Sequence, residues 1–298
     1  QKLQIESEPI RNEFVIDTQF YAGNDVFPQK IVEIGKPAIM RNHRVVAVTF
    51  NPFQYNPATK ELRIISNIEV SVETSGRGGE NVKTRNLKKS RYFEKLYEST
   101  ILNYLSVQNR DDEYQNPSIL FIYRNNATVE NYIEYLADWK HTKGFEVTLA
   151  STSVTGTTTT SIKNYIQNAY NTWENPPEFI TLAGDVSGSY SIPTYYESWS
   201  GYNGPGDHAY TQLEGGDILA DAFIGRLSFE SFSQLETIIA KVLYYEKEPY
   251  LSQTNWYNKS VMVGDASTSG SSCVHTKRYI KEMMDDYVPN MNITEVYS

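Results

Sequence analysis

The hydrophobic residues follow two different periods on either side of a linker near residue 100. Up to about Arg85, segments such as EFVIDTQF, RVVAVTF and KELRIISNIEVSVE alternate apolar and polar residues, which is the period-two pattern of half-buried strands. NPFQYNPATK lies between the last two segments and contains Asn-Pro twice, which indicates a tight hairpin connection. Short strands without intervening helices predict an antiparallel β-sandwich over residues 1–86.

Strands and helices alternate from Asn116 onward. SILFIYR is a continuous apolar run, as expected for a parallel strand that is buried on both faces. Helical patterns then alternate with FEVTLA, EFITLAGD, DAFIGRLS, KSVMVGD and NITEVYS. In the first helix we expect Thr128 as the N-cap and Gly144 at the end. The alternation predicts a doubly wound α/β domain with a parallel sheet.

The segment between the halves divides the chain further. SRYFEKLYESTILNYLSV is predicted to be helical, and QNRDDEYQNP is polar and ends in Asn-Pro, so we expect an exposed linker that a protease can enter. The 298 residues suffice for two cores. The sequence therefore predicts a β-sandwich over 1–86, a helix and linker over 87–115, a first α/β subdomain over 116–256, and the start of a second one over 257–298.

Composition and charge exclude several classes of partner. The net charge of −9 repels phosphate backbones, so we expect no nucleic-acid partner. One cysteine rules out an internal disulfide framework and a multi-cysteine zinc site. No apolar run reaches the roughly 18 residues that span a bilayer, and no signal-peptide pattern follows Gln1. These features fit a cytoplasmic protein or a secreted one that has been trimmed, and the 23 tyrosines weakly favour an extracellular surface.

Three groups of residues are candidates for chemistry. Asp185 and Asp265 each follow a strand in a Gly-Asp pair, where a doubly wound sheet binds ligands, although each aspartate could equally cap the next element. Cys273 and His275 are close in sequence, but we favour Cys273 as a small buried hydrophobic residue over a nucleophile. The tyrosine-rich loop after Asp185 carries further carboxylates that could hold Ca²⁺, and its aromatic rings could stack on sugars. These carboxylates are Asp207, Glu214, Asp217 and Asp221.

Long stretches of the sequence resemble the gingipain-type cysteine peptidases. VFPQKIVEIGKPAIMRNHRVVAVTFNPFQYNPATKELRIISNIEVSVE is similar to the later part of their propeptide. LADWKHTKGFEV, FITLAGDVSG, GDHAYTQLEGGDILADAFIGRLSFES and VMVGDAS are similar to the first portion of their catalytic domain. The resemblance covers nearly all of the chain and is most specific from Asp207 to Arg226. It implies a caspase-like α/β domain after a β-sandwich propeptide, in a bacterial zymogen that is secreted or held at the cell surface.

The resemblance also assigns roles to residues. The catalytic histidine and cysteine of the family follow a strand that matches NITEVYS, so they would lie beyond residue 298, and Cys273 is not the nucleophile. The family carries an acid that orients this histidine, and Asp265 is the matching residue. Ser272 stands where basic-specific members have an acidic residue in the S1 pocket, and a neutral hydroxyl cannot balance a buried cation. A polar or small P1 residue is therefore expected.

Metal binding and maturation follow from the same resemblance. The family binds Ca²⁺ in the catalytic domain, for which the candidates are Asp185, Asp207, Asp217 and Asp221, and no organic cofactor is expected. Its propeptide blocks the active site until proteolysis, which makes VQNRDDEYQNP, with Arg110, the expected maturation junction.

We interpret the chain as a zymogen fragment of a cysteine endopeptidase that acts on protein or peptide substrates and is inactive by itself. The alternatives are a non-catalytic secreted module that binds Ca²⁺ or carbohydrate, and a degenerate scaffold of the same fold.

Overall fold

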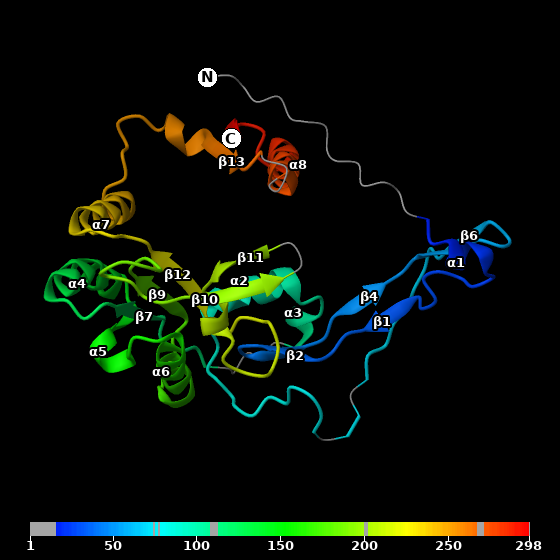
Figure 1. The fold of residues 1–298 in the computed structure, drawn as a ribbon, viewed down its shortest axis with the longest axis horizontal. Coiled ribbons are helices and arrows are strands. Elements are labelled where there is room, and N and C mark those ends of the chain that lie inside the picture. Colours follow the sequence, from blue (N-terminus) through cyan, green and yellow to red (C-terminus); the bar gives the residue numbers. More distant parts are fainter. Residues whose placement is uncertain are drawn as a thin grey trace. The chain divides into compact units, whose positions relative to one another are not determined.

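The structure is a computed structural model, and it describes residues 16–73, 75–76, 78–107, 113–199, 202–266 and 271–297 (Figure 1). A larger compact unit comprises Pro28–Gln54 and Arg63–Lys247, and a second unit includes the chain from Glu248 onward. Within the described ranges, no helix has the length and apolar character needed to cross a membrane. The domain boundaries expected from the sequence stay a prediction.

Four parallel strands form the central sheet of the larger unit. They are β7 (Ser118–Tyr123), β8 (Glu146–Ser151), β9 (Phe179–Ala183) and β12 (Phe223–Leu227), in the spatial order β12-β9-β7-β8. The chain therefore starts inside the sheet at β7, adds β8 on one side, and then adds β9 and β12 on the other. This reversal is the mark of a doubly wound sheet, so the α/β prediction is confirmed.

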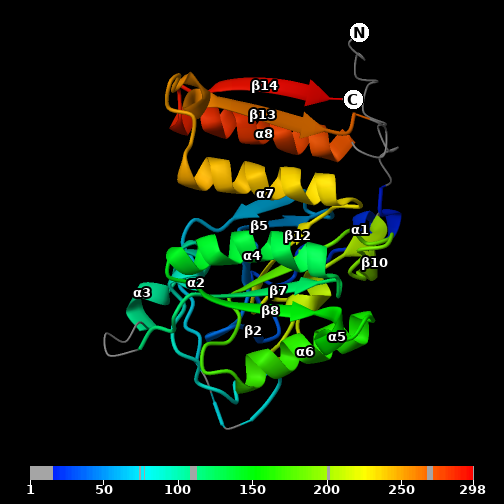
Figure 2. The same cartoon turned by 90° about the vertical axis from the view of Figure 1, so that its left-hand side faces the viewer.

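Helices cover both faces of this sheet, as Figure 2 shows. Alternate residues of β7 point to opposite faces. Leu120 and Ile122 join a core with α6 (Thr159–Thr172), while Ile119 and Phe121 join a second core with α4 (Ala127–Thr142) and α7 (Phe232–Lys247). All six residues of β7 are buried, which explains the continuous apolar run from Ile119 to Tyr123.

The ends of α4 confirm one prediction and correct another. Asn126, and not Thr128, is the N-cap: its side chain accepts hydrogen bonds from the amides of Thr128 and Val129. Thr128 thus lies in the first turn, where its own amide needs an acceptor. Gly144 follows the helix at φ +90°, as expected of a residue that ends a helix.

Several elements were not predicted from the sequence. The tract STSVTGTTTT contains the single-turn helix α5 (Thr152–Thr155). The tyrosine-rich loop contains a hairpin of β10 (Tyr195–Trp199) and β11 (Tyr202–Gly206), followed by the 3₁₀ helix η1 (His208–Thr211). β11 contains glycine and proline, which are unusual in strands, so its sequence lacks the alternation of apolar and polar residues that predicts a strand.

The N-terminal part contains short antiparallel pairs. β1 (Val32–Ile34) pairs with β4 (Val48–Phe50), β2 (Ala38–Met40) with β3 (His43–Val45), and β5 (Phe53–Asn56) with β6 (Glu61–Ile64). The antiparallel pairing agrees with the sequence. The β-sandwich is not confirmed, because the described strands of this part form three separate two-stranded sheets.

Two strand predictions in this part are wrong. EFVIDTQF leads into helix α1 (Thr18–Ala22), where the Asp17 side chain accepts a hydrogen bond from the Phe20 amide and so caps the helix. KELRIISNIEVSVE forms a strand only as far as Ile64. The expected helical segment is confirmed as α2 (Arg91–Thr100) and α3 (Tyr104–Val107), whose residues Phe93, Tyr97 and Tyr104 are buried together.

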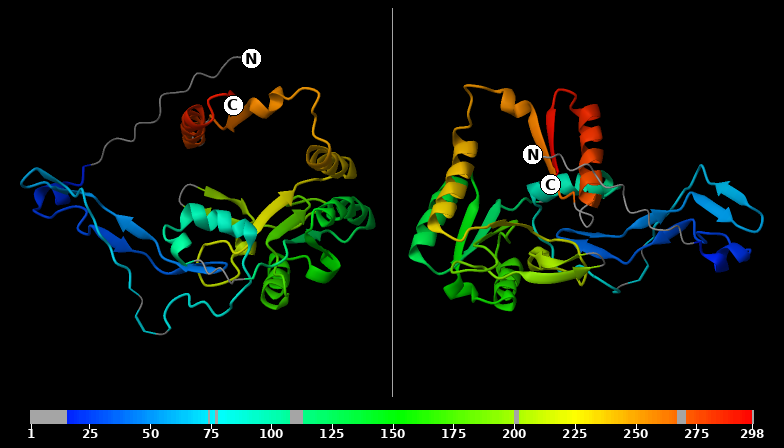
Figure 3. Two further views of the ribbon diagram at one scale, coloured as in Figure 1. Left: turned by 180° about the vertical axis from the view of Figure 1, so that it is seen from behind. Right: turned by 45° about the horizontal axis from the view of Figure 1, so that its top comes forward.

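The second unit contains a strand–helix–strand motif, seen from another side in Figure 3. After the 3₁₀ helix η2 (Asn255–Asn258), β13 (Lys259–Gly264) pairs in parallel with β14 (Asn292–Tyr297), and α8 (Ser271–Tyr287) connects them. Val274 of α8 is buried almost completely, at 1% exposure. This order of elements is the one predicted from KSVMVGD to NITEVYS.

Candidate functional site

Asp185 and Ser228 lie together at the carboxyl end of the central sheet. β9 and β12 are parallel neighbours whose last residues, Ala183 and Leu227, are paired, so the residues after them emerge at the same edge. The Ser228 hydroxyl donates to Oδ1 of Asp185 at 2.7 Å, and the Val186 amide donates to the same oxygen at 2.8 Å. These hydrogen bonds lower the pKa of Asp185 below its usual value, so this carboxyl group is ionised at neutral pH.

Gly184 makes this turn possible. Its φ of +146° is open to glycine and strained for other residues. A Cβ atom at this position would lie 2.1 Å from the carbonyl oxygen of Tyr190, so even alanine cannot fit without a shift of the backbone. The Gly-Asp pair noted in the sequence therefore has a steric reason.

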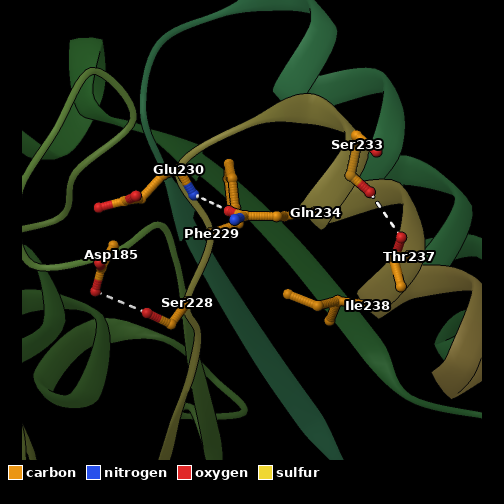
Figure 4. A pocket seen from close by; sticks show the side chains of 8 residues that line it. All are labelled: Asp185, Ser228, Phe229, Glu230, Ser233, Gln234, Thr237 and Ile238. Atoms are coloured by element: carbon orange, nitrogen blue, oxygen red, sulfur yellow. Dashed lines mark hydrogen bonds between the residues drawn. The ribbon is translucent and has the colours of Figure 1, made fainter.

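A pocket of about 400 Å³ opens beside Asp185, at the start of α7 (Figure 4). Figure 4 shows the Ser228 hydroxyl directed at the carboxylate of Asp185. The lining residues include carboxylates, hydroxyls and an amide, which suits binding of a polar group. None of them is a cysteine or a histidine, so the pocket does not contain a cysteine nucleophile paired with a histidine base. The lining residues are Asp185, Ser228, Phe229, Glu230, Ser233, Gln234, Thr237 and Ile238. Ser228 was not among the residues predicted from the sequence, and its only signal there is its place directly after strand β12.

Asp265 lies at the carboxyl end of the other parallel pair. It directly follows β13, and its side chain is exposed. The last pair between β13 and β14 joins Gly264 to Tyr297, so positions after either strand start from the same edge of the sheet. The prediction that Asp265 follows a strand is confirmed, while its role with a histidine stays a prediction.

Cys273 is exposed, so the expectation of a small buried hydrophobic residue is wrong. Both Cys273 and His275 belong to α8, and residues two apart on a helix point about 200° away from each other. The neighbouring Val274 occupies the buried face instead. Ser272 belongs to the first turn of the same helix, but its side chain lies outside the described structure, and so does Arg110.

The carboxylate of Asp207 is bound by an arginine. Arg226 donates from Nε to Oδ2 at 2.9 Å and from Nη2 to Oδ1 at 2.7 Å, and Thr194 adds a hydroxyl hydrogen bond of 2.7 Å. Both side chains of the ion pair are mostly buried. A guanidinium group in this position supplies the positive charge that a Ca²⁺ ion would otherwise supply.

Asp217 and Asp221 accept hydrogen bonds from main-chain amides. Asp217 binds the amides of Ile39 and Leu219 at 2.8 and 2.9 Å. Asp221 is completely buried and binds the amides of Arg41, Leu213 and Glu214 at 2.7 to 2.8 Å. Burial raises the pKa of Asp221 to about 6, against the opposing effect of these amides.

The four carboxylates proposed as Ca²⁺ ligands are thus used separately within the protein. In the part of the chain that the structure describes, no three histidine, cysteine or acidic residues gather in a way that could hold a metal ion. The structure does not bring Asp185, Asp207, Asp217 and Asp221 into one shared site. Ca²⁺ binding stays a prediction.

Arg41 is a buried residue near these aspartates, and no pattern in the sequence indicates its burial. It is completely buried, although it comes from the hairpin of β2 and β3, far from Asp221 in sequence. A lone arginine between two short strands carries no signal of burial, because arginine is almost never fully buried without partners. Its partners become visible only in three dimensions.

Comparisons with protein families match both parts of the chain. Residues 112–298 match the family described as Peptidase family C25, and residues 3–119 match Propeptide_C25. The two matches meet at the segment that the sequence analysis took as a linker. Together they cover nearly the whole chain.

Individual relatives agree with these matches. Gingipain R2 of Porphyromonas gingivalis is 29% identical over 90% of this chain and 36% of its own length. Lys-gingipain W83 of the same organism is 28% identical over 98% of this chain and 17% of its own length. The solved complex of the pro- and mature domains of RgpB from Porphyromonas gingivalis has a TM-score of 0.49 at 23% identity, over 61% of this chain and 42% of that one. The chain thus spans about a third or less of the length of these curated relatives.

Proposed function

The chain belongs to peptidase family C25, and from this membership we propose that it is part of the zymogen of a gingipain-like cysteine endopeptidase. The observation that carries the proposal is the pair of adjoining matches, to the propeptide over 3–119 and to the peptidase over 112–298. A propeptide directly before a peptidase is the arrangement of an enzyme made in an inactive form. We further propose that the whole protein is exported and that its complete propeptide forms a β-sandwich.

The proposed reaction is hydrolysis of a peptide bond by a cysteine and a histidine that follow this segment in the whole protein. The thiolate attacks the peptide carbonyl, the histidine transfers a proton to the leaving amine, and backbone amides stabilise the oxyanion. Water, deprotonated by the histidine, then hydrolyses the resulting thioester, which releases the acid and restores the thiol. Asp265 would hold the imidazole in the required tautomer and stabilise its protonated form.

The pairing of β13 and β14 supports this role for Asp265. Adjacent parallel strands end at the same edge of a sheet, and here the last pair is Gly264 with Tyr297. A histidine placed soon after β14 would therefore start from the edge where Asp265 follows β13. The exposed position of Asp265 is consistent with a partner that approaches from outside this segment.

Substrate preference is proposed from position 272. A serine hydroxyl carries no charge, so it does not offset the desolvation of an arginine or lysine side chain in an S1 pocket. We propose that the enzyme cleaves after polar or small residues. Processing at Arg110 would then require a different protease.

The test is a peptide-library assay on the whole protein, with and without iodoacetamide. We expect hydrolysis that iodoacetamide abolishes. Because Cys273 is exposed and also reacts with this reagent, the assay should be repeated with Cys273→Ser. That variant should remain active and remain sensitive to iodoacetamide.

Two outcomes would contradict the proposal. Hydrolysis that persists after complete alkylation would exclude a thiolate mechanism. If the protein is folded and its propeptide has been removed, but it hydrolyses no peptide, a degenerate scaffold or a binding module would be favoured.

A further inference from the structure

Arg41 stands in a strained position at the tip of a hairpin. Met40 of β2 pairs with His43 of β3, which leaves Arg41 and Asn42 as a two-residue loop. Arg41 has a φ of +45°, a value that the mirror-image hairpin turns require at the first loop position and for which glycine is preferred. Such strain in a residue other than glycine persists only where surrounding contacts fix it.

The side chain of Arg41 enters a set of polar groups that fits a guanidinium ion. Nη1 donates to the carbonyl oxygens of Asp221 at 2.7 Å and Pro177 at 3.1 Å. Nη2 donates to Oε1 of Gln115 at 2.7 Å and to the carbonyl oxygen of Pro176 at 3.1 Å. The ring of Tyr170 lies 5.6 Å from the guanidinium carbon, within the range of a cation–π interaction.

We call these residues, Gln115, Tyr170, Pro176, Pro177 and Asp221, the guanidinium socket. Tyr170, Pro176, Pro177 and Asp221 lie in the stretch that matches the C25 peptidase alone. Gln115 lies where the two matches overlap and follows residues 108–112, at which the linker is to be cut. Arg41 precedes the linker and lies within the stretch that matches the propeptide. Arg41 therefore joins the two functional halves of the chain through groups that a cut in the linker would leave in place.

Other hydrogen bonds support the same junction. The Ile39 amide donates to Oδ2 of Asp217 at 2.8 Å, and the Gly216 amide donates to Oδ1 of Asn81 at 2.8 Å. Arg41 differs from these contacts because it is charged and completely buried. Loss of a buried charged partner leaves the opposing groups desolvated and unpaired, which costs much more than the loss of a contact exposed to water.

From this geometry we infer that Arg41, bound in the guanidinium socket, retains the propeptide on the peptidase after the linker has been cut. The inference rests on the proposed function in so far as it takes the two halves to be propeptide and peptidase. In this arrangement cleavage alone does not release the propeptide, and release requires the guanidinium group to leave its socket.

The test uses the whole 298-residue chain with residues 108–112 replaced by the recognition sequence of a specific protease. After complete cleavage, shown on a denaturing gel, size-exclusion chromatography reports whether the two fragments elute together. The dissociation constant is then measured by binding of the C-terminal fragment to the immobilised N-terminal fragment. The assay needs no peptidase activity, so its outcome is independent of whether the whole protein proves to be an enzyme.

We expect the cut wild-type fragments to elute together. Arg41→Ala should increase the dissociation constant by about 100-fold, because it removes the buried hydrogen bonds of a charged group. Arg41→Lys keeps the positive charge, but a lysine ammonium group is not planar and cannot bind the carbonyl oxygens and Gln115 as the guanidinium group does. This substitution should weaken the complex by about 10-fold or more.

Arg44 provides the matched control. It belongs to the same hairpin, but its guanidinium group donates to the carbonyl oxygens of Glu80 and Asn81, which precede the linker as Arg41 does. Arg44→Ala should leave the dissociation constant within about threefold of wild type, as for other exposed interactions.

Each outcome decides the inference. It is overturned if the cut wild-type fragments separate, if Arg41→Ala holds them as tightly as wild type, or if Arg44→Ala weakens the complex as much as Arg41→Ala. Circular dichroism of the uncut variants shows whether each one folds. Should Arg41→Ala fail to fold, the comparison of Arg41→Lys with Arg44→Ala decides the question.

Discussion

The guanidinium group of Arg226 binds both carboxylate oxygens of Asp207, at 2.9 and 2.7 Å. The same arginine donates from Nη1 to the carbonyl oxygens of Gly184 and Ile192 at 2.8 and 2.7 Å. One side chain on β12 thereby fixes the start of η1 and the loop that carries Asp185. Asp207, which the sequence suggested as a metal ligand, is therefore bound by the guanidinium group of Arg226.

Removal of this cation should destabilise the protein strongly. Arg226→Ala leaves Asp207 charged and largely buried, so we expect the free energy of unfolding to fall by about 3–5 kcal/mol. Urea denaturation followed by circular dichroism measures this. Lys88→Ala, which breaks an exposed pair with Glu174, should cost less than about 1 kcal/mol. Equal losses for the two variants would contradict the interpretation of the Arg226–Asp207 pair.

The contact between α4 and α7 should depend on pH through Glu246. Partial burial acts to raise the pKa of Glu246, but hydrogen bonds from Lys140, Lys143 and Trp139 outweigh it and lower the pKa to about 2. Because the folded-state pKa lies below that of the unfolded chain, this stabilisation is present above about pH 5 and is lost as the pH falls towards 2.

Glu246→Gln should therefore lower the free energy of unfolding by about 1–3 kcal/mol at pH 7 and by much less near pH 2.5. Denaturation curves of both proteins across this range test the expectation. Glu236→Gln, on the exposed side of the same helix, is the control and should show no such trend. A difference between Glu246→Gln and wild type that stays constant with pH would refute this account.

Two glycines allow steric and conformational costs to be separated. Gly184→Ala combines an unfavourable φ with a Cβ atom 2.1 Å from a carbonyl oxygen, so we expect a loss of about 3 kcal/mol or more. Gly188→Ala has a φ of +87° but no heavy atom within 4 Å of the new Cβ, so it should cost only about 1–2 kcal/mol. Thermal denaturation of the two variants would show whether this order holds.

In the whole protein, Asp265→Asn should reduce kcat with little change in KM. An asparagine can hold a histidine in the wrong tautomer, and the corresponding change in a serine-protease triad lowers kcat by about 10⁴-fold. We expect a loss of about 10²–10⁴-fold in peptide hydrolysis by a variant that still folds. A variant with full activity would remove Asp265 from the mechanism.

Much of the α/β part could be predicted because its sequence and its burial agree. In SILFIYR the apolar run from Ile119 to Tyr123 coincides with buried positions of β7, and both faces of that strand are covered. Leu235 and Ile239 recur at helical spacing in α7 and are buried. In such segments local pattern and tertiary packing favour the same structure.

The sequence is least informative where a tertiary partner decides the contacts of a residue. It does not show that Arg226 and main-chain amides bind Asp207, Asp217 and Asp221, whose role as Ca²⁺ ligands stays a prediction. Cys273 was expected to be buried because cysteine usually is, whereas the adjacent Val274 takes the inward position on α8. Nothing in the sequence around Arg41 indicates the polar groups that surround it.

The division of β7 between two cores limits how this segment can change. A single inserted or deleted residue would send Leu120 and Ile122 towards the helices that now contact Ile119 and Phe121, and the reverse. Both cores would then be filled with side chains of the wrong volume at once. Length variation among descendants of this gene should therefore be confined to the connections on either side of this strand, which itself can vary only by substitution.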